Sequence, residues 1–370
     1  MPRVIGIDPG TVSIDVCGLE NGRVFLDRVF PTSDALANPS LLVDVLDQAH
    51  RTAPLDLVAG PSGYGLPLTS VQELSEDDLK LAYLAVEGEP GGIEGLRTLM
   101  RTLARAVPSI PIVLTPGVVH LSSVPAHRKV NRVDMGTADK VCATALAVHE
   151  RVERSGCREQ DASLILLELG GAFTAAVAVD GGRIVDGLGG SSGPLGLRAA
   201  GALDGEVAFL AGTVSKRFLF AGGAATIAGQ PDVTAEELAT SRAPRSRLAW
   251  EALIESAVKA VATLAVSVPR GCDVILSGRL ARVAGIREEL MRRLARLWVI
   301  GSDPPVHVLN GFATVAKQAS QGAALIADGL AGGRSARLVT ALGIREAQGT
   351  VLDHLYVISQ ATARARLGIG

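Results

Sequence analysis

The sequence predicts an α/β protein of two domains, each a mixed sheet of five strands flanked by helices. Short apolar strands alternate with helical patterns along the 370 residues, and a chain of this length holds about two domains of ~150 residues each. One order of elements also occurs twice, namely strand, acid with glycines, strand, turn and strand, first from Val4 and again from Ser163. This repeat would place two glycine turns, each with a carboxylate, on opposite sides of one cleft.

The composition narrows the class of protein. Hydrophobic residues make up 48% and charged residues 20%, so a sizeable core is available. The formal net charge is -2, which gives no electrostatic reason to expect nucleic acid or an anionic membrane as a partner. The four cysteines show no metal-ligand spacing and are typical of reduced thiols in the cytoplasm. A strand begins within four residues of the start and no run of ~18 apolar residues occurs, so we expect neither a signal peptide nor a membrane span.

Strands and helices follow one another along the first half. Apolar runs predict strands, and an Asn-Gly pair at Asn21 predicts a hairpin turn. Apolar residues at helical spacing predict helices. The expected strands are Val4–Ile7, Ser13–Leu19, Val24–Phe30, Leu55–Ala59 and Pro111–Thr115, and the expected helices are Leu41–Arg51, Glu94–Ala106 and Val141–Val152.

The opening hairpin carries the first candidate site. Asp8 follows the first strand directly and precedes the tight turn Pro9-Gly10-Thr11. Backbone N–H groups of such a turn could hold a phosphate, and the carboxylate could hold the hydrated cation that accompanies it. The alternative is a solvated aspartate that only begins the turn.

A second polar cluster precedes the helix at Val141. One interpretation is structural: a basic loop in which Asp134 caps the helix. The other is a site loop in which three basic residues face an anionic substrate and an aspartate handles a metal or a proton. The basic residues are Arg128, Lys129 and Arg132, and the aspartates are Asp134 and Asp139.

The second half begins after a polar boundary near Gly156. The expected strands are Ser163–Leu167, Phe173–Val179, Arg183–Val185, Asp273–Leu276 and Pro305–Leu309, and the expected helices are Arg247–Val268, Val283–Leu297 and Thr314–Leu330. The last helix is rich in small residues and suited to close packing. A glycine-rich loop, Gly187–Gly205, carries Arg198, and a partly helical tail starts at Ala336.

The three glycine turns that follow apolar strands resemble the nucleotide motifs of the ASKHA superfamily, which comprises acetate and sugar kinases, Hsp70 and actin. The first turn, Gly6 to Thr11, looks like the phosphate-1 motif. Glu168-Leu169-Gly170-Gly171 looks like phosphate-2, and Ile275-Leu276-Ser277-Gly278-Arg279 looks like the adenosine motif. The segments Asp134–Val152 and Thr314–Leu330 look like its two connecting helices. The resemblance implies a two-domain actin-like ATPase fold, related to ribonuclease H, with the nucleotide in the interdomain cleft.

Within the superfamily the sequence resembles butyrate kinase and the DUF1464 family of predicted butyrate kinases. The similar stretches are Pro125–Ala143, Gly182–Asp186, Gly193–Leu203 and Gln321–Ala324. Two features depart from that pattern. No histidine lies between Arg128 and Lys140, and Arg279 stands where the adenosine motif usually has a second glycine. Beside a nucleotide pocket this large cation could bind phosphate or could block the adenine slot.

The resemblance implies ATP and Mg²⁺ as cofactors and assigns roles to residues. Asp8 would hold Mg²⁺ through water, with Glu168 as a second acid. Donors to the nucleotide would come from Gly10, Thr11, Gly170, Gly171, Ser277, Gly278 and Arg279. Arg198 would meet the substrate carboxylate or the transferring phosphoryl group, and Asp134 or Asp139 would act as a base or orient the metal. Ser62 and Tyr64 would form a wall of the substrate pocket, alongside Arg128, Arg132 and Asp139.

The implied function is ATP-dependent phosphorylation of a small acid or alcohol, with a short-chain carboxylate as the leading substrate. The alternative is an ATP-switched regulatory or activator ATPase that acts on a protein partner. The expected domains are 1–157 with 314–335, 158–313, and a tail at 336–370. Acetate and butyrate kinases associate, which leaves a homodimer open, and the tail is the segment that reads as an interface.

Overall fold

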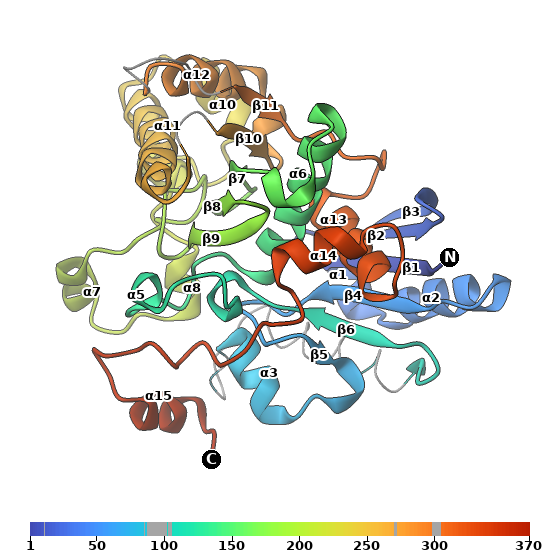
Figure 1. Cartoon of the computed structure of the whole chain (residues 1–370). Helices are drawn as coiled ribbons and strands as arrows, with labels where there is room; N and C mark the ends of the chain where they lie inside the picture. The colour runs from blue at the N-terminus through green and yellow to red at the C-terminus, as the bar shows by residue number, and fades with distance from the viewer. Residues whose placement is uncertain (11, 85, 87–101, 103–105, 270–271, 298–304) are drawn as a thin grey trace. The chain divides into compact units, whose positions relative to one another are not determined.

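The computed structural model describes residues 1–10, 12–84, 86, 102, 106–269, 272–297 and 305–370. The predicted helix Glu94–Ala106 lies almost entirely outside these residues. Thr11, a predicted phosphate donor, also lies outside them. The described chain forms two compact units. Unit 1 comprises Met1–Val133, Thr137–Gln160 and Asn310–Gly370, and unit 2 comprises Asp134–Gly136 and Asp161–Leu309. Figure 1 shows both units coloured along the chain.

Unit 1 contains a six-stranded mixed sheet in the order β3-β2-β1-β4-β6-β5. The two hairpin partners β2 and β3 run antiparallel, whereas β1, β4 and β6 run parallel. The left-handed backbone of Asn21 and Gly22 makes the predicted turn between β2 and β3, with φ of 55° and 73°. The strands are β1 (Arg3–Pro9), β2 (Ser13–Glu20), β3 (Arg23–Pro31), β4 (Leu57–Pro61), β5 (Thr69–Ser70) and β6 (Ile112–Thr115).

Helices cover both faces of this sheet. Ile5 and Ile7 point to one face and pack with Leu42 and Leu46 of α2 in the core. Gly6 points to the other face, where α13 passes so close that a Cβ on Gly6 would lie 2.1 Å from the carbonyl oxygen of Ser320. The helices of unit 1 are α1 (Thr32–Ala37), α2 (Ser40–Thr52), α3 (Glu76–Tyr83), α5 (Ala126–Lys129), α6 (Ala138–Ser155), α13 (Gln318–Leu330), α14 (Ala336–Leu342) and α15 (Gln360–Leu367).

The packing of α13 explains its small residues. A Cβ on Gly322 would lie 1.7 Å from the carbonyl oxygen of Cys142 in α6, so only glycine permits this contact between the two helices. The predicted close packing of the helix is therefore confirmed. Its predicted start at Thr314 is wrong, because α13 begins at Gln318. The preceding N–H groups of Thr314, Val315 and Ala316 donate instead to the carboxylate of Asp27 on β3.

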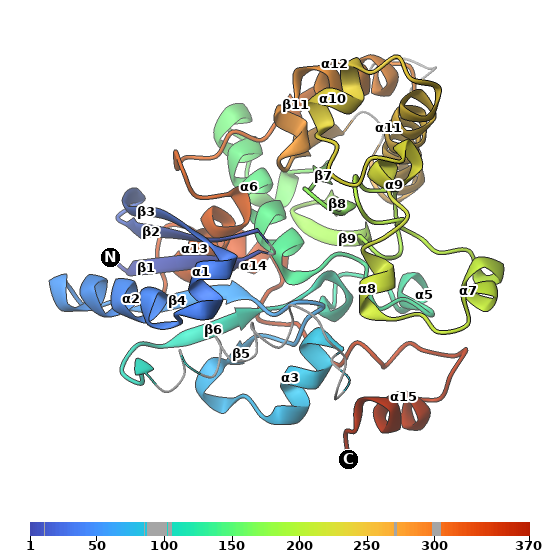
Figure 2. The same ribbon diagram turned by 180° about the vertical axis from the view of Figure 1, so that it is seen from behind.

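Unit 2 contains a five-stranded mixed sheet in the order β11-β10-β7-β8-β9. Its strands are β7 (Leu164–Leu169), β8 (Thr174–Asp180), β9 (Arg183–Leu188), β10 (Asp273–Ser277) and β11 (Val306–Val308). Its helices are α7 (Gly205–Ala211), α8 (Lys216–Leu219), α9 (Ala224–Ala228), α10 (Ala235–Thr240), α11 (Pro244–Leu264) and α12 (Ala284–Leu294). Ile165 and Leu167 pack with Leu253 of α11 and Leu290 of α12 in a second core. Figure 2 shows the same elements from behind.

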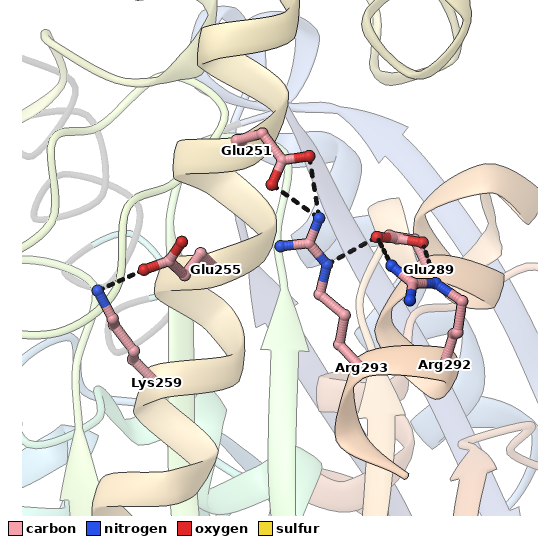
Figure 3. A network of polar contacts seen from close by, with 6 residues as sticks. All are labelled: Glu251, Glu255, Lys259, Glu289, Arg292 and Arg293. Atoms are coloured by element: carbon pink, nitrogen blue, oxygen red, sulfur yellow. Dashed lines mark hydrogen bonds and ion pairs between the residues drawn. The ribbon is translucent and has the colours of Figure 1, made fainter. Parts of the chain in front are cut away.

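Charged side chains join α11 to α12 on the outside of unit 2 (Figure 3). Arg293 lies 2.7 Å from Glu251 and 2.6 Å from Glu289, and Arg292 lies 2.5 Å from Glu289. Hydrogen bonds from the two arginines lower the pKa of Glu289 to about 2. The two helices are therefore tied together by ionic contacts as well as by the core.

The predicted mixed α/β architecture with two sheets is confirmed, with one difference in the first sheet. That sheet has six strands and not five, because the short β5 pairs with β6 through Thr69 and Leu114. Two residues of strand carry too little periodicity for the sequence to reveal them. Among the described residues, no helix is both long enough and apolar enough to cross a membrane.

Candidate functional site

Three parallel strands of unit 1 end at one edge of its sheet. Asp8 lies near the end of β1, Ser62 follows β4, and Thr115 ends β6. The carboxyl ends of parallel strands are where open α/β sheets bind ligands. Asp8 alternates with Ile7 along β1, so its side chain points to the same face as Gly6, which is the face that α13 covers.

The carboxylate of Asp8 is the most perturbed acid of this edge. Its side chain is buried, and burial and neighbouring charges, with no hydrogen bond from a described residue among the causes, perturb its pKa. Burial, as the largest cause, and the negative charges of Asp139 and Asp15 raise the pKa of Asp8 to about 7, although the positive charges of Lys317 and Lys140 oppose the shift. A buried carboxylate with this pKa has an electrostatic need for a nearby cation.

Two lysines already lie near Asp8 without pairing with it directly. Lys140 lies 2.5 Å from Asp139 in the first turn of α6, and Thr137 also donates to Asp139. Burial alone would raise the pKa of Asp139, but the charge and hydrogen bond of Lys140 lower it below its ordinary value. Asp139 is therefore ionised and paired, while Asp8 is the acid left for a further cation.

Lys317 stands at the N-cap position of α13. Its Nζ lies 3.2 Å from Asp15, and its backbone N–H donates to the same carboxylate at 3.0 Å. Asp15 is directly opposite Asp8 on the neighbouring strand. This pairing holds the lysine at the mouth of the opening hairpin.

Gly10 gives the lysine room. A Cβ on Gly10 would lie 3.0 Å from Nζ of Lys317, tighter than ordinary van der Waals contact. The N–H of Gly10 donates within the hairpin, to the carbonyls of Asp8 and Ser13 at 3.0 Å each. The first glycine turn therefore contributes space and a fixed hairpin, and its own N–H is already used.

In unit 2 the other two predicted glycine turns lie side by side. Glu168 on β7 is in register with Ser277 on β10, and the two strands run parallel. Gly278 has φ +86°, and a Cβ on it would lie 2.4 Å from the carbonyl oxygen of Leu169. Both turns therefore form one edge, and glycine at 278 is required for their close approach.

This edge combines a buried hydroxyl with open glycine backbone. The hydroxyl of Ser277 is buried and has no hydrogen-bond partner among the described residues. Gly170 donates its N–H to Phe173 at 2.9 Å, while nothing lies within 4 Å of a Cβ placed on Gly171. Arg279 begins the next turn, and its side chain is exposed. A buried free hydroxyl beside open backbone is a suitable setting for an oxygen-rich ligand.

The structure changes the interpretation of Asp134. The predicted cap is wrong, because the N-cap of α6 is Thr137 and no side chain caps it. The carboxylate of Asp134 accepts from the N–H of Gly136 at 3.2 Å and from the N–H and hydroxyl of Ser191 at 2.8 Å each. Its backbone carbonyl accepts from Ser192. These bonds make Asp134 an anchor within unit 2, because its carboxylate is already occupied by donors.

Other predicted substrate contacts also make structural bonds. The exposed Arg198 donates to the carbonyl of Pro231. Ser62 is fully buried, donates to the carbonyl of Thr115 at 2.7 Å and accepts from the N–H of Leu66. Lys129 is buried and donates to the carbonyl of Leu121 at 2.9 Å.

The remaining predicted positions are half-buried. Tyr64 packs against the core of unit 1. Arg128 and Arg132 lie at and just after the end of the short helix α5, with the N–H of Arg132 donating to the carbonyl of Lys129. None of these three is brought next to Asp8 by a described hydrogen bond or ion pair.

Sequence reasoning missed three charged partners of Asp8, namely Asp15, Lys140 and Lys317. Asp15 could have been found from the hairpin, because residues opposite each other in an antiparallel pair point to one face. Lys140 follows Asp139 directly. No local signal marks Lys317, which lies more than 300 residues from Asp8 in the sequence.

The side chains near Asp8 bear on whether a metal ion could bind there. No group of three or more His, Cys, Asp or Glu side chains is arranged to hold an ion among the described residues. Mg²⁺ does not need such a group, because it keeps several waters and commonly uses one or two carboxylates together with substrate phosphates. The buried carboxylate of Asp8, to which no described residue donates a hydrogen bond, fits that mode of binding.

Comparison with known proteins gives the family. A family model described as "Protein of unknown function (DUF1464)" matches residues 6–357. The chain belongs to the DUF1464 family. No curated protein matches the sequence.

Solved structures show the same fold at low sequence identity. A propionate kinase from Francisella tularensis has a TM-score of 0.63 and 15% identity, over 88% of this chain and 98% of that chain. An acetate kinase from Porphyromonas gingivalis has a TM-score of 0.61 and 14% identity, over 87% and 98%. A ROK hexokinase from Thermus thermophilus has a TM-score of 0.50 and 19% identity, over 88% and 97%. The DUF1464 protein therefore has the ASKHA fold.

Proposed function

We propose that this DUF1464 protein is an ATP- and Mg²⁺-dependent phosphotransferase that acts on a small metabolite, with a short-chain carboxylate as acceptor. The observation that carries the proposal is the carboxylate of Asp8. It is buried at the carboxyl end of a parallel strand, accepts no hydrogen bond from the described part of the chain, and is influenced by the charges of two lysines. Phosphoryl transfer asks little more of a protein than positioned cations and a metal, because the chemistry is mainly electrostatic.

The roles within unit 1 follow from the contacts. Asp8 would hold hydrated Mg²⁺, which supplies charge neutralisation to the phosphates when bound. Lys317, held by Asp15, would add a second positive charge near the same point. Lys140 would be kept in place by Asp139. This arrangement gives Asp139 a positioning role, because its own carboxylate is already paired.

The roles within unit 2 concern the nucleotide. Gly170, Gly171 and Gly278 would let phosphate oxygens approach the backbone, and the unpartnered hydroxyl of Ser277 would donate to one of them. Glu168 lies at the same edge of unit 2, in register with Ser277. Asp134 and Arg198 have no part in the proposal, because their bonds to Ser191 and Pro231 already account for them.

The carboxylate acceptor is supported by the similar structures. The TM-scores to the propionate and acetate kinases, 0.63 and 0.61, exceed that to the hexokinase, 0.50. A carboxylate is also a nucleophile that needs no base. Its oxygen would attack the terminal phosphorus, the bond to the ADP oxygen would break, and the products would be an acyl phosphate and ADP.

The test measures ADP formation from Mg²⁺ and ATP with acetate, propionate, butyrate or glucose as acceptor. Hydroxylamine converts any acyl phosphate to a hydroxamate, which can be quantified separately. We expect both products with a short-chain acid and their loss in Asp8→Asn. The matched control is Asp44→Asn, an exposed acid on α2. ADP formation that no acceptor stimulates, or that only glucose stimulates, would refute the carboxylate assignment.

A further inference from the structure

A long segment of unit 2 begins and ends at the same point of the fold. Ala199 and Gly222 form an antiparallel bridge, the N–H of Ala200 donates to Ala221 at 2.9 Å, and the N–H of Gly223 donates to Arg198 at 2.9 Å. Residues 201–220, here called the arm, lie between these tied ends. Excursions of this length are uncommon inside compact domains unless they serve a function.

The arm is apolar yet buries almost none of its own side chains. It contains α7 and α8, and neither helix has a buried residue. In both views α7 lies away from the sheet and from α11 and α12 of its own unit (Figures 1 and 2). The exposed fractions are 78% for Phe209 and 81% for Leu210, with 48% for Val207. A helix this short and apolar is not stable alone, so its apolar face needs a partner.

The base of the arm is fixed, so the exposed face is presented in a defined way. The ring of Phe220 packs edge-on against Phe173, with 4.7 Å between centroids. Asp204 caps α7 by accepting from the N–H groups of Glu206 and Val207. Local bonds therefore order the arm, while nothing among the described residues covers the outer side of α7.

The size of the apolar face indicates what kind of contact it can make. The exposed parts of Val207, Phe209, Leu210 and Phe220 amount to on the order of 400 Å². A standard protein interface buries roughly 800 Å² on each partner. The arm thus supplies about half of such an interface as an apolar centre, and the polar residues beside it would complete the rim.

The charges of the arm are self-complementary. Glu206 lies at the start of α7 and Arg217 lies in α8, and both side chains are exposed without a described ion pair or hydrogen bond. In a two-fold pair of arms, a contact between one residue of the first copy and another residue of the second is repeated with the copies exchanged. Glu206 of one copy could then meet Arg217 of the second, twice, around the apolar centre.

We propose that the arm is a self-association surface, on which a second copy of this chain seats its own arm in a two-fold dimer. The apolar side chains of α7 form the centre, and two Glu206–Arg217 pairs set the orientation. The proposal does not depend on the phosphotransferase activity. It also places association in unit 2 and not in the C-terminal tail, where the sequence alone suggested an interface.

The first test is sedimentation equilibrium of the full chain over a range of concentrations. We expect a reversible dimer, weakened at least tenfold by the pair of substitutions Phe209→Ser and Leu210→Ser. The matched control is Val266→Ser, which removes a single apolar side chain that is 86% exposed elsewhere in unit 2. Circular dichroism and thermal unfolding of each variant show whether the fold is kept.

The second test reverses one charge at a time. Glu206→Arg alone and Arg217→Glu alone should each dissociate the dimer, because like charges would then meet twice. An equimolar mixture of the two variants should associate again as a heterodimer, because both pairs become opposite in sign. No association of the wild-type chain, or no recovery in the mixture, would overturn the proposal. Binding of the monomeric chain to lipid vesicles through the arm would overturn it in favour of a membrane.

Discussion

Replacing Asp8 with asparagine should stabilise the protein without ligands, and the gain should depend on pH. The folded state raises the pKa of Asp8 from 3.8 to about 7, mainly by burial and then by the charge of Asp139. A group with a raised folded pKa contributes stability below its unfolded pKa, and this contribution is lost as the pH rises through the folded pKa. Above pH 7 the folded protein therefore carries a buried charge that the unfolded chain carries in water.

The structure sets the size of the gain. A shift of about three pKa units corresponds to an upper limit of ~4 kcal/mol, at about 1.4 kcal/mol per unit. The amide introduces its own buried donors and does not fully recover this limit, so we expect a gain of about 2 kcal/mol at pH 8. At pH 4.5 the wild-type carboxyl is protonated in the fold, and the gain should fall close to zero.

Urea unfolding at pH 4.5 and pH 8 measures this difference directly. The matched control is Asp15→Asn on the neighbouring strand. Its carboxylate accepts from Ser13 and from the N–H of Lys317 and pairs with Nζ of Lys317, so this variant should be less stable at pH 8. Mg²⁺ with ATP should stabilise the wild type and not Asp8→Asn. An Asp8→Asn variant that is destabilised equally at both pH values would refute the electrostatic reasoning.

Two further predictions concern packing and acid stability. Gly322→Ala should lower the free energy of unfolding by about 3 kcal/mol, because its Cβ would lie 1.7 Å from the carbonyl oxygen of Cys142. The control is Gly205→Ala, whose Cβ enters open space and should leave thermal unfolding unchanged. His120 is buried, and burial and the charge of Lys129 lower its pKa from 6.5 to about 4. Between these pH values the imidazole is protonated in the unfolded chain and neutral in the folded one. As the pH falls across that window, the contribution of His120 to stability should fall by up to about 3 kcal/mol, opposite in sign to that of Asp8. The difference in unfolding free energy between the wild type and His120→Phe should therefore change by that amount between pH 7 and pH 4, and a difference that does not depend on pH would contradict this assignment.

Local patterns predicted the elements that have strong periodicity or turn chemistry. The Asn21-Gly22 turn followed from its preference for left-handed backbone, and the structure has φ of 55° and 73° there. The burial of α11 followed from its helical spacing, although the helix runs Pro244–Leu264 and ends before the predicted Val268. The arm was not predicted as helix, because α7 and α8 are too short for a periodic signal.

Tertiary contacts decided what local patterns could not. The segment from Thr314 was expected to be helical, and its composition supports a helix, but Asp27 lies 287 residues earlier and takes its N–H groups. Asp134 has the sequence position of a cap, yet Ser191 and Ser192 occupy it from 57 and 58 residues away. Side-chain acceptors compete with helical backbone bonds in this way, and no local window contains the competitor.

The link between packing and chemistry in this protein is α13. Gly6 and Gly322 let the helix lie against β1 on one side and α6 on the other, at distances that no larger residue permits. Because the helix packs so close to the sheet, its N-cap residue reaches the opening hairpin, where Lys317 pairs with Asp15 beside Asp8. A change that lifts the helix from the sheet would therefore also move the lysine away from the buried acid. The small residues that the sequence marks as packing positions thus fix the charge balance of the candidate site.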